Sequence, residues 1–258
     1  MKVSAAFALF SDLSVSVRVA FFPTLIDIYR NPSLILHVSR TFMSHVWAAF
    51  ASPTDESGRP VKQALFPHAT GTVLDLGAGF GHLIQYLDCS KVTKYVALEP
   101  NTRMHSVLRQ TAESAGFCES DGTLIILSCG AEDVTQILEA LGGLHLVDTI
   151  TSVLALCSIP SPNRVITTLV RDILKPGGQV LFYEHVLSPR ADVAWWQRFW
   201  TPLWGVFSDG CRLDCPTHLH ISEMKYVDAD GTLVEGKEPG EEEENLWWHQ
   251  AGRFVKHI

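Results

Sequence analysis

The strongest constraint on the fold is a regular alternation of short apolar runs with segments of helical spacing. With the turns that follow them, the apolar runs occupy residues 71–81, 94–101, 123–133, 146–159 and 179–186. Their continuous apolar character is typical of strands in a sheet that is covered on both faces. Strands that alternate with helices form parallel βαβ units. We therefore predict an α/β fold with a doubly wound, mostly parallel sheet, whose ligands bind beyond the carboxyl ends of the strands.

Composition narrows the class of partner. The 258 residues are 47% hydrophobic, and the net charge is −8 from 20 basic and 28 acidic residues. A chain this apolar can bury a sizeable core, which excludes disorder throughout. The acidic balance argues against a nucleic-acid partner, because phosphate binding needs a basic surface. Much of the negative charge lies in residues 235–244, which we predict to be a solvated loop.

The first 60 residues differ from the rest of the chain. They are predicted to be helical, with breaks at Pro23 and Asn31, and to end in a polar loop at 51–60. We therefore expect an N-terminal helical cap at 1–60 and a main domain at 61–258. The six cysteines are too sparse for a disulfide framework, which favours an intracellular, reducing compartment.

The apolar N-terminal segment has two interpretations. Asp12, Arg18 and Asp27 interrupt it, so no run of 18 uncharged apolar residues exists and a spanning helix is not expected. One interpretation is an amphipathic helix that lies on an internal membrane or covers a hydrophobic pocket. The other is an ordinary helix packed on the core. The sequence leaves both open, and we expect the protein to be cytoplasmic or peripherally membrane-associated.

The first strand enters a glycine-rich turn with the sequence DLGAGFG. Gly77 and Gly79 permit a tight turn that a ligand can approach closely. The dinucleotide fingerprint needs a third glycine where this chain has His82. Asp75 precedes the turn, and its carboxylate would repel a pyrophosphate but would suit an ammonium group. The turn therefore disfavours a nicotinamide cofactor.

An acidic residue follows the second strand. Glu99 lies 22 residues after Gly77, close to the offset at which a carboxylate accepts hydrogen bonds from ribose hydroxyls. S-adenosylmethionine has a ribose and an ammonium group but no phosphate, which distinguishes it from a nicotinamide dinucleotide. We predict this cofactor, with a nicotinamide-dependent oxidoreductase as the disfavoured alternative.

Motifs in this order are those of a known family. The stretches VLDLGAGFG, YVALEPN, SCGAED, LALCSIP and LKPGGQVLFYEHV, within residues 71–187, resemble class I S-adenosylmethionine-dependent methyltransferases. The later WWQRFWTPLWGVFSDGC resembles a narrower group, the methyltransferase-like-seven family of alkyl thiol methyltransferases, and LWWHQAGRFVKHI resembles its C-terminal strand. The resemblance implies methyl transfer to a thiol or hydroxyl of a lipophilic small molecule. The alternative is a protein of this fold that binds the cofactor without methylating, such as a cyclase.

The resemblance also implies roles for residues that follow the first four strands. Asp75, Gly77, Ala78 and Gly79 would hold the methionine end, Glu99 the ribose, Pro100, Asn101, Ala131 and Glu132 the adenine, and Ser152, Val153 and Leu154 the region of the sulfonium.

Two residues are candidate catalytic bases. His185, just past the fifth strand, is the first, because imidazole titrates near neutral pH. Asp209, in the segment SDGC, is the second. Each has a structural alternative: a pocket-lining histidine for the first, and a turn residue before Gly210 for the second.

An aromatic segment follows the fifth strand. We interpret it as a lid over an apolar acceptor, with Pro202 bending or ending its helix. A core helix or a helix at a membrane interface is the alternative. Its large side chains are Trp195, Trp196, Phe199, Trp200, Leu203 and Trp204.

No metal site is expected from the sequence. Cys211, Cys215, His218 and His220 have a spacing that departs from the usual zinc patterns. Cys157 is interpreted as a small buried hydrophobe rather than a reactive thiol.

Overall fold

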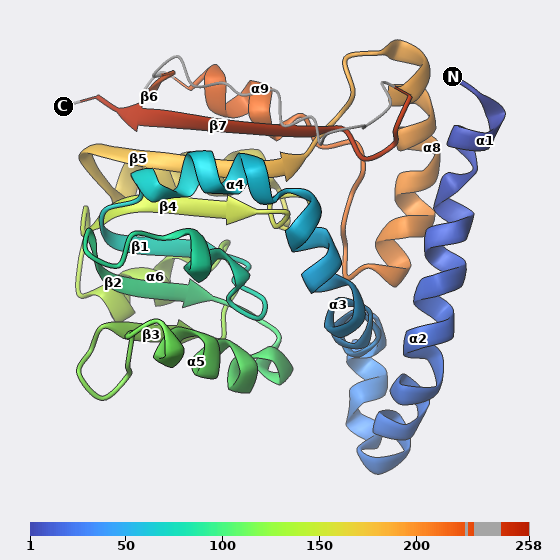
Figure 1. Cartoon of the computed structure of the whole chain (residues 1–258), viewed down its shortest axis with the longest axis horizontal. Coiled ribbons are helices and arrows are strands. Elements are labelled where there is room, and N and C mark those ends of the chain that lie inside the picture. Colours follow the sequence, from blue (N-terminus) through green and yellow to red (C-terminus); the bar gives the residue numbers. More distant parts are fainter. Residues whose placement is uncertain (225–226, 230–243, 258) are drawn as a thin grey trace.

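The computed structural model describes residues 1–224, 227–229 and 244–257. Within these residues, seven strands form one sheet in the order β3-β2-β1-β4-β5-β7-β6 (Figure 1). The first five strands are parallel, and β7 runs antiparallel to both of its neighbours. The strands are β1 (Gly71–Leu76), β2 (Val92–Leu98), β3 (Leu124–Leu127), β4 (Val147–Val153), β5 (Leu174–His185), β6 (Val227–Ala229) and β7 (His249–Lys256). The predicted doubly wound, mostly parallel sheet is confirmed.

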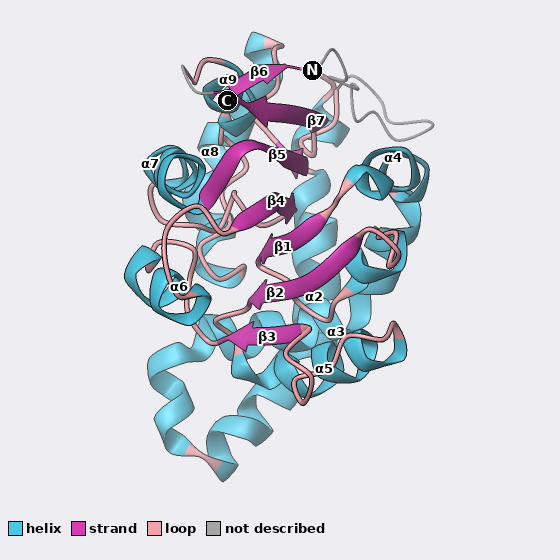
Figure 2. Cartoon of the chain, turned by 90° about the vertical axis from the view of Figure 1, so that its left-hand side faces the viewer, coloured by secondary structure: helices cyan, strands magenta, loops and turns pink. Residues whose placement is uncertain are grey.

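Helices cover both faces of the sheet. Figure 2 shows α6 and α7 on one face and α4 and α5 on the other. Side chains of alternate strand residues belong to two separate hydrophobic cores, one on each face of the sheet. Leu74 and Val96 pack toward α6 and α7. Val73 and Tyr95 pack toward α4 and α5. This explains the continuously apolar strands, because side chains on both faces are buried.

The helices and helical turns fall into three groups along the chain. The N-terminal group is α1 (Val3–Ala6), α2 (Ala8–Arg30), η1 (Pro32–His37), α3 (Val38–Ser57), α4 (Arg59–Leu65) and η2 (Phe66–His68). The crossover group is η3 (His82–Tyr86), η4 (Thr102–Met104), α5 (His105–Ser114), α6 (Val134–Leu141), α7 (Pro162–Thr168) and η5 (Leu169–Ile173). The late group is α8 (Ala191–Phe207) and α9 (Thr217–Ser222).

Two predictions about the N-terminal region were wrong. Pro23 does not break the helix but lies inside α2, because Ala20 and Thr24 are buried on either side of it and hold the helix in place. Residues 51–60 are not a loop: α3 runs to Ser57, and α4 follows after one residue. Burial overrides the polar, turn-forming composition of this stretch.

A buried ion pair fixes the junction between α3 and α4. Lys62 is 2% exposed, and its Nζ atom lies 2.6 Å from Asp55 Oδ1. The other oxygen of Asp55 accepts hydrogen bonds from Gln85 Nε2 at 2.7 Å and from the Tyr86 hydroxyl at 2.8 Å. The junction is therefore anchored to η3, next to the glycine turn.

The helices α2, α3 and α8 stand beyond the carboxyl ends of the parallel strands (Figure 1). Asp27, near the end of α2, accepts a hydrogen bond from His45 of α3 at 2.7 Å and pairs with Arg103 of η4. Burial alone would raise the pKa of Asp27, but these two partners hold it below its usual value. The pair of helices is thus tied to the sheet edge where ligands of this fold bind.

Among the described residues, one helical segment, Val3–Arg30, has the length and apolar composition needed to cross a membrane. In its most apolar 18-residue stretch, 22% is buried inside the protein. In α2 Leu9, Ser16, Ala20 and Thr24 are buried, so the helix packs through one narrow stripe and leaves most of its large apolar side chains exposed.

Part of the acidic segment is described. Glu244 accepts a hydrogen bond from the Lys2 backbone N–H at 2.7 Å. The remainder of the loop predicted at 235–244 lies outside the described residues.

Candidate functional site

The glycine turn after β1 has the backbone that its sequence predicts. Gly77 and Gly79 have φ angles of +64° and +56°, a region that favours glycine. A Cβ on Gly77 would lie 2.7 Å from the Cβ of Ala155, and one on Gly79 would lie 3.1 Å from Trp47 Nε1. Both glycines are therefore required, and the Trp47 indole of α3 lies directly against the turn.

Asp75 lies at the end of β1 beside that turn. Its buried carboxylate accepts hydrogen bonds from the Tyr95 hydroxyl and from Thr151 Oγ1, the latter at 2.9 Å. Burial raises the pKa of Asp75 to about 7, with a further contribution from Glu99, although the two hydroxyl donors oppose the shift. A buried carboxyl with no cationic partner among the described residues is suited to receive an ammonium group.

Glu99 connects the end of β2 to the glycine turn. Its Oε2 atom accepts the Gly79 N–H at 2.8 Å, and its Oε1 atom accepts the Asn101 N–H at 2.7 Å. Burial raises the pKa of Glu99, although these backbone donors oppose the shift. Each carboxylate oxygen keeps a second lone pair that can accept from a ribose hydroxyl.

The residues beside Glu99 also lie at this edge. Asn101 donates from Nδ2 to the Arg40 carbonyl at 3.2 Å, which joins the loop after β2 to α3. Pro100 is half-buried, and Ala131, after β3, is buried. The Glu132 carboxylate lies against Gly130: a Cβ atom added to Gly130 would be 2.3 Å from Glu132 Oε2.

The loop after β4 is organised by Glu184, a residue that the sequence analysis did not select. One carboxylate oxygen accepts from Ser152 Oγ at 2.7 Å and from the Ala155 and Leu156 N–H groups at 3.0 and 3.2 Å. Ser152 is therefore a support for this loop. Val153 is half-buried, and Leu154, at a φ of +54°, lines the cavity described next.

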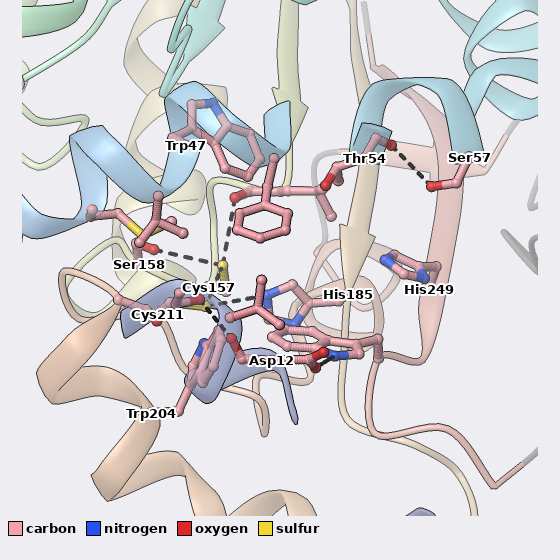
Figure 3. Close-up of a pocket in the computed structure, with 18 of the residues that line it drawn as sticks. Asp12, Trp47, Thr54, Ser57, Cys157, Ser158, His185, Trp204, Cys211 and His249 are labelled. Atoms are coloured by element: carbon pink, nitrogen blue, oxygen red, sulfur yellow. Dashed lines mark hydrogen bonds between the residues drawn. The ribbon is translucent and has the colours of Figure 1, made fainter. Parts of the chain in front are cut away.

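A cavity of about 400 Å³ lies between the N-terminal helices and the carboxyl ends of β4 and β5 (Figure 3). Its wall is mostly apolar and aromatic. It comes from α2, α3, the loop after β4, the end of β5, α8 and the segment before β7, through residues that include Val15, Trp47, Phe50, Leu154, Trp204 and Trp247. The N-terminal helices thus cover a hydrophobic pocket, as one sequence interpretation anticipated.

Of the twelve predicted cofactor residues, Leu154 is the one that lines the cavity. Asp75, Gly79 and Glu99 are not in its lining, whereas Trp47 belongs both to the lining and to the surroundings of Gly79. The indole of Trp47 therefore separates the cavity from the glycine turn.

The aromatic segment of α8 only partly fits the predicted lid. Trp204 lines the cavity, but Trp195 and Phe199 are 56% and 53% exposed. Trp200 instead donates its indole N–H to the Ala6 carbonyl at 2.7 Å, which joins α8 to α1. Pro202 does not end the helix, since the aromatic packing of Trp200 and Trp204 continues across it.

Three potential ligands or nucleophiles meet at one end of the cavity. Cys211 Sγ lies 3.5 Å from Cys157 Sγ and 3.4 Å from His185 Nε2 (Figure 3). Burial alone would lower the pKa of His185, but Cys157 and Glu184 raise it overall. The pKa of Cys157 is raised by its hydrogen-bonded neighbour Cys211 and by burial. Within the described chain, His185 Nδ1 has no hydrogen-bond partner.

The second candidate base is not part of this group. Asp209 lies outside the cavity lining, and its Oδ2 atom accepts from Arg40 Nε at 3.2 Å. Its φ of +49° and the Gly210 φ of +85° place it in a tight turn. The structure therefore favours the turn role for Asp209.

The four residues whose spacing loosely resembles a zinc motif do not form one cluster among the described residues; they are Cys211, Cys215, His218 and His220. His220 Nε2 is hydrogen-bonded to Thr167 Oγ1 at 2.9 Å. In the described residues, the compact group of possible ligands is instead Cys157, His185 and Cys211. Sequence spacing could not reveal this group, because its members come from three separate parts of the chain: the loop after β4, the end of β5 and the loop after α8.

The chain is similar to known proteins in sequence and in fold. A family model described as a methyltransferase domain matches residues 40–224. The thiol S-methyltransferase TMT1B of Rattus norvegicus is 25% identical over 201 residues, which cover 74% of this chain and 78% of that protein.

Two solved structures share the fold at low sequence identity. An O-methyltransferase family protein from Burkholderia thailandensis is 15% identical with a TM-score of 0.54, covering 86% of this chain and 60% of that one. The [4+2]-cyclase SpnF is 13% identical with a TM-score of 0.53, covering 78% of this chain and 82% of that one. The names of these two proteins describe different reactions, so the similarity shows the fold alone.

Proposed function

The chain belongs to the methyltransferase domain family, and from that premise we propose that it methylates the thiol, or the hydroxyl, of a lipophilic small molecule. The family identifies the cofactor as S-adenosylmethionine and removes the nicotinamide alternative. The observation that carries the acceptor class is the apolar cavity that ends at His185 and two cysteines. The thiol S-methyltransferase relative supports a sulfur acceptor.

The residues at the sheet edge fit the cofactor. The buried Asp75 carboxyl lacks a cationic partner among the described residues, which suits the ammonium group, and Glu99 retains lone pairs for ribose hydroxyls. Gly77 and Gly79 carry no side chain that would keep a ligand away from the backbone of the turn. When bound, S-adenosylmethionine supplies an electrophilic methyl group on a sulfonium.

The cavity supplies what this chemistry needs from the protein. Its aromatic wall binds an apolar acceptor and excludes water, and placing the acceptor beside the cofactor site removes much of the entropic barrier. His185 is the group at the closed end that assists the acceptor in losing its proton. Leu154 and Trp47 lie between the two binding regions and would set their relative position.

The experiment that tests this function uses methyl-labelled cofactor. The purified chain is incubated with a panel of lipophilic thiols, phenols, carboxylic acids and amines, and labelled products are identified by mass spectrometry. We expect labelled thioethers, with weaker labelling of phenols. Label on amines or acids alone would refute the acceptor class, and cofactor binding without any product would favour the non-methylating alternative.

We also propose that the N-terminal helix contacts an internal membrane, with the rest of the chain in the cytoplasm. Helix α2 exposes Phe21, Phe22, Leu25 and Ile26, and α8 exposes Trp195 and Phe199. Figure 1 shows α2 and α8 side by side at the edge of the molecule. We name these six residues the N-terminal apolar surface. Exposed apolar side chains on two neighbouring helices support insertion at a lipid interface and give a lipophilic acceptor a route toward the cavity.

A further inference from the structure

We propose that Cys157, His185 and Cys211 form a binding site for zinc or a similar thiolate-preferring divalent cation, with one ligand position open to the acceptor cavity. The three donor atoms lie within 4.8 Å of one another, and all three residues are buried. They come from the loop after β4, the last residue of β5 and the loop after α8.

Two of the three spacings between the donor atoms are close to those of tetrahedral coordination, and the third pair lies within 4.8 Å. Ligand bonds of about 2.3 Å to sulfur and 2.0–2.1 Å to nitrogen place two sulfurs roughly 3.8 Å apart, and sulfur and nitrogen roughly 3.5 Å apart. The structure has 3.5 Å between the sulfurs of Cys157 and Cys211 and 3.4 Å between Cys211 Sγ and His185 Nε2. A cation could therefore be held with shifts of a few tenths of an ångström in these two spacings.

The cluster is held together before any cation binds. The Arg212 N–H donates to the Cys157 carbonyl at 3.0 Å, which fastens the two cysteine loops to each other. The Val186 N–H donates to the Trp248 carbonyl at 2.6 Å, which fixes the chain just after His185. Donors fixed in this way need little rearrangement on binding.

Charge and ligand number point to the same class of cation. Two thiolates neutralise a divalent cation, so the loaded site would carry no net charge in its buried setting. The described residues contribute no fourth His, Cys, Asp or Glu to the cluster. Three protein ligands and one open position are typical of catalytic zinc sites. All three residues also line the cavity, so the open position would face it.

The open position has a consequence that rests on the proposed function. An acceptor thiol would bind there as a thiolate, with its proton released to water, so in the loaded protein the cation would take over from His185 the task of promoting proton loss. A lone pair of that sulfur forms the new bond to the methyl carbon, while the old bond from the methyl to the donor sulfur breaks and leaves its pair on the donor. The product is a neutral thioether, a weaker ligand, and it can leave.

The first test measures metal in the full chain. Protein is expressed with zinc, purified under reducing conditions and analysed by inductively coupled plasma mass spectrometry. We expect about one zinc per chain in the wild type and in the control Cys89→Ser, whose thiol is exposed. Cys157→Ser and Cys211→Ser should fall to background. Equal zinc in wild type and the two cluster variants would overturn the proposal, as would a Cys157–Cys211 disulfide that persists in metal-free protein purified under the same reducing conditions.

The second test uses cobalt and does not depend on variants that could misfold. Wild-type protein loaded with Co²⁺ should show thiolate-to-metal charge transfer and the visible bands of tetrahedral cobalt. An alkyl thiol added without S-adenosylmethionine should shift those bands. Absence of the cobalt spectrum would overturn the site. Cobalt bands that do not change when the alkyl thiol is added would refute the binding of the acceptor thiol at the open ligand position. Thiol methylation by metal-free protein would leave the proposed function standing and refute this inference.

Discussion

Glu99 holds the glycine turn in its ligand-binding shape, because its Oε2 atom accepts the Gly79 N–H at 2.8 Å. The other oxygen accepts the Asn101 N–H at 2.7 Å, so one carboxylate organises both the turn after β1 and the loop after β2. The residue expected to bind the ribose is therefore also the residue that builds the turn beneath the cofactor. Binding and local order are coupled through a single side chain.

That coupling predicts the effect of Glu99→Gln. The amide has one acceptor oxygen, so either the Gly79 or the Asn101 N–H loses its partner, at a cost of about 1–3 kcal/mol in the free energy of unfolding. Cofactor affinity should also fall, because the amide nitrogen cannot accept from a ribose hydroxyl. Denaturant unfolding and calorimetry measure the two effects. Wild-type affinity in a destabilised variant would show that Glu99 supports the turn without contacting the cofactor.

Asp75 predicts a pH dependence. Its pKa is raised from 3.8 to about 7, so between these pH values the folded chain keeps a proton that the unfolded chain has released. The free energy of unfolding should therefore fall as the pH rises through this window and level off above about 7. The ammonium group of the cofactor binds the ionised carboxylate of Asp75 more strongly than the protonated acid. The affinity for the cofactor should therefore rise with pH over the upper part of the same pH range.

The matched variant for this prediction is Asp75→Asn, which keeps the shape but cannot titrate. Tyr95 and Thr151 can rotate their hydroxyls toward the amide. The difference in unfolding free energy between wild type and variant should change between pH 5 and 8, and cofactor binding should be weak at every pH. Parallel stability profiles would show that the pKa of Asp75 is not raised in the folded chain.

Local sequence predicted the sheet and the turn well, because each signal is carried by neighbouring residues. The run GTVLDLGAGFG contains its own strand, its turn and the glycines that the positive φ angles require. The helix breaks were predicted poorly. Pro23 and Pro202 lie inside α2 and α8, where packing on both sides of each proline outweighs the lost backbone hydrogen bond.

Candidate cofactor residues could be selected from the sequence only where they lie at the ends of strands. Asp75 and Glu99 could be selected because carboxyl ends of parallel strands share one edge. Trp47 could not, since nothing in its helix indicates that it packs on Gly79. Cys157 and Cys211 are 54 positions apart, and only the folded loops bring their sulfurs to 3.5 Å.

The N-terminal apolar surface predicts binding to lipid vesicles. Phe22 and Ile26 on α2 are 69% and 49% exposed, so Phe22→Ser with Ile26→Ser should weaken flotation with phosphatidylcholine vesicles by roughly tenfold or more. Val107→Ser is the control, because this residue is 43% exposed on α5, away from the surface. Equal flotation of all three proteins, or none by the wild type, would contradict membrane contact through this helix.

Trp47 should report cofactor binding. Its indole lies against Gly79, where an added Cβ would be 3.1 Å from Nε1, so a ligand on the glycine turn must contact or displace the ring. We expect S-adenosylmethionine to change the intrinsic tryptophan fluorescence, and Trp47→Phe to remove most of that change. Trp195→Phe is the matched control, because Trp195 is 56% exposed on α8. If Trp47→Phe keeps the full signal while binding remains normal, the cofactor lies elsewhere than beneath α3.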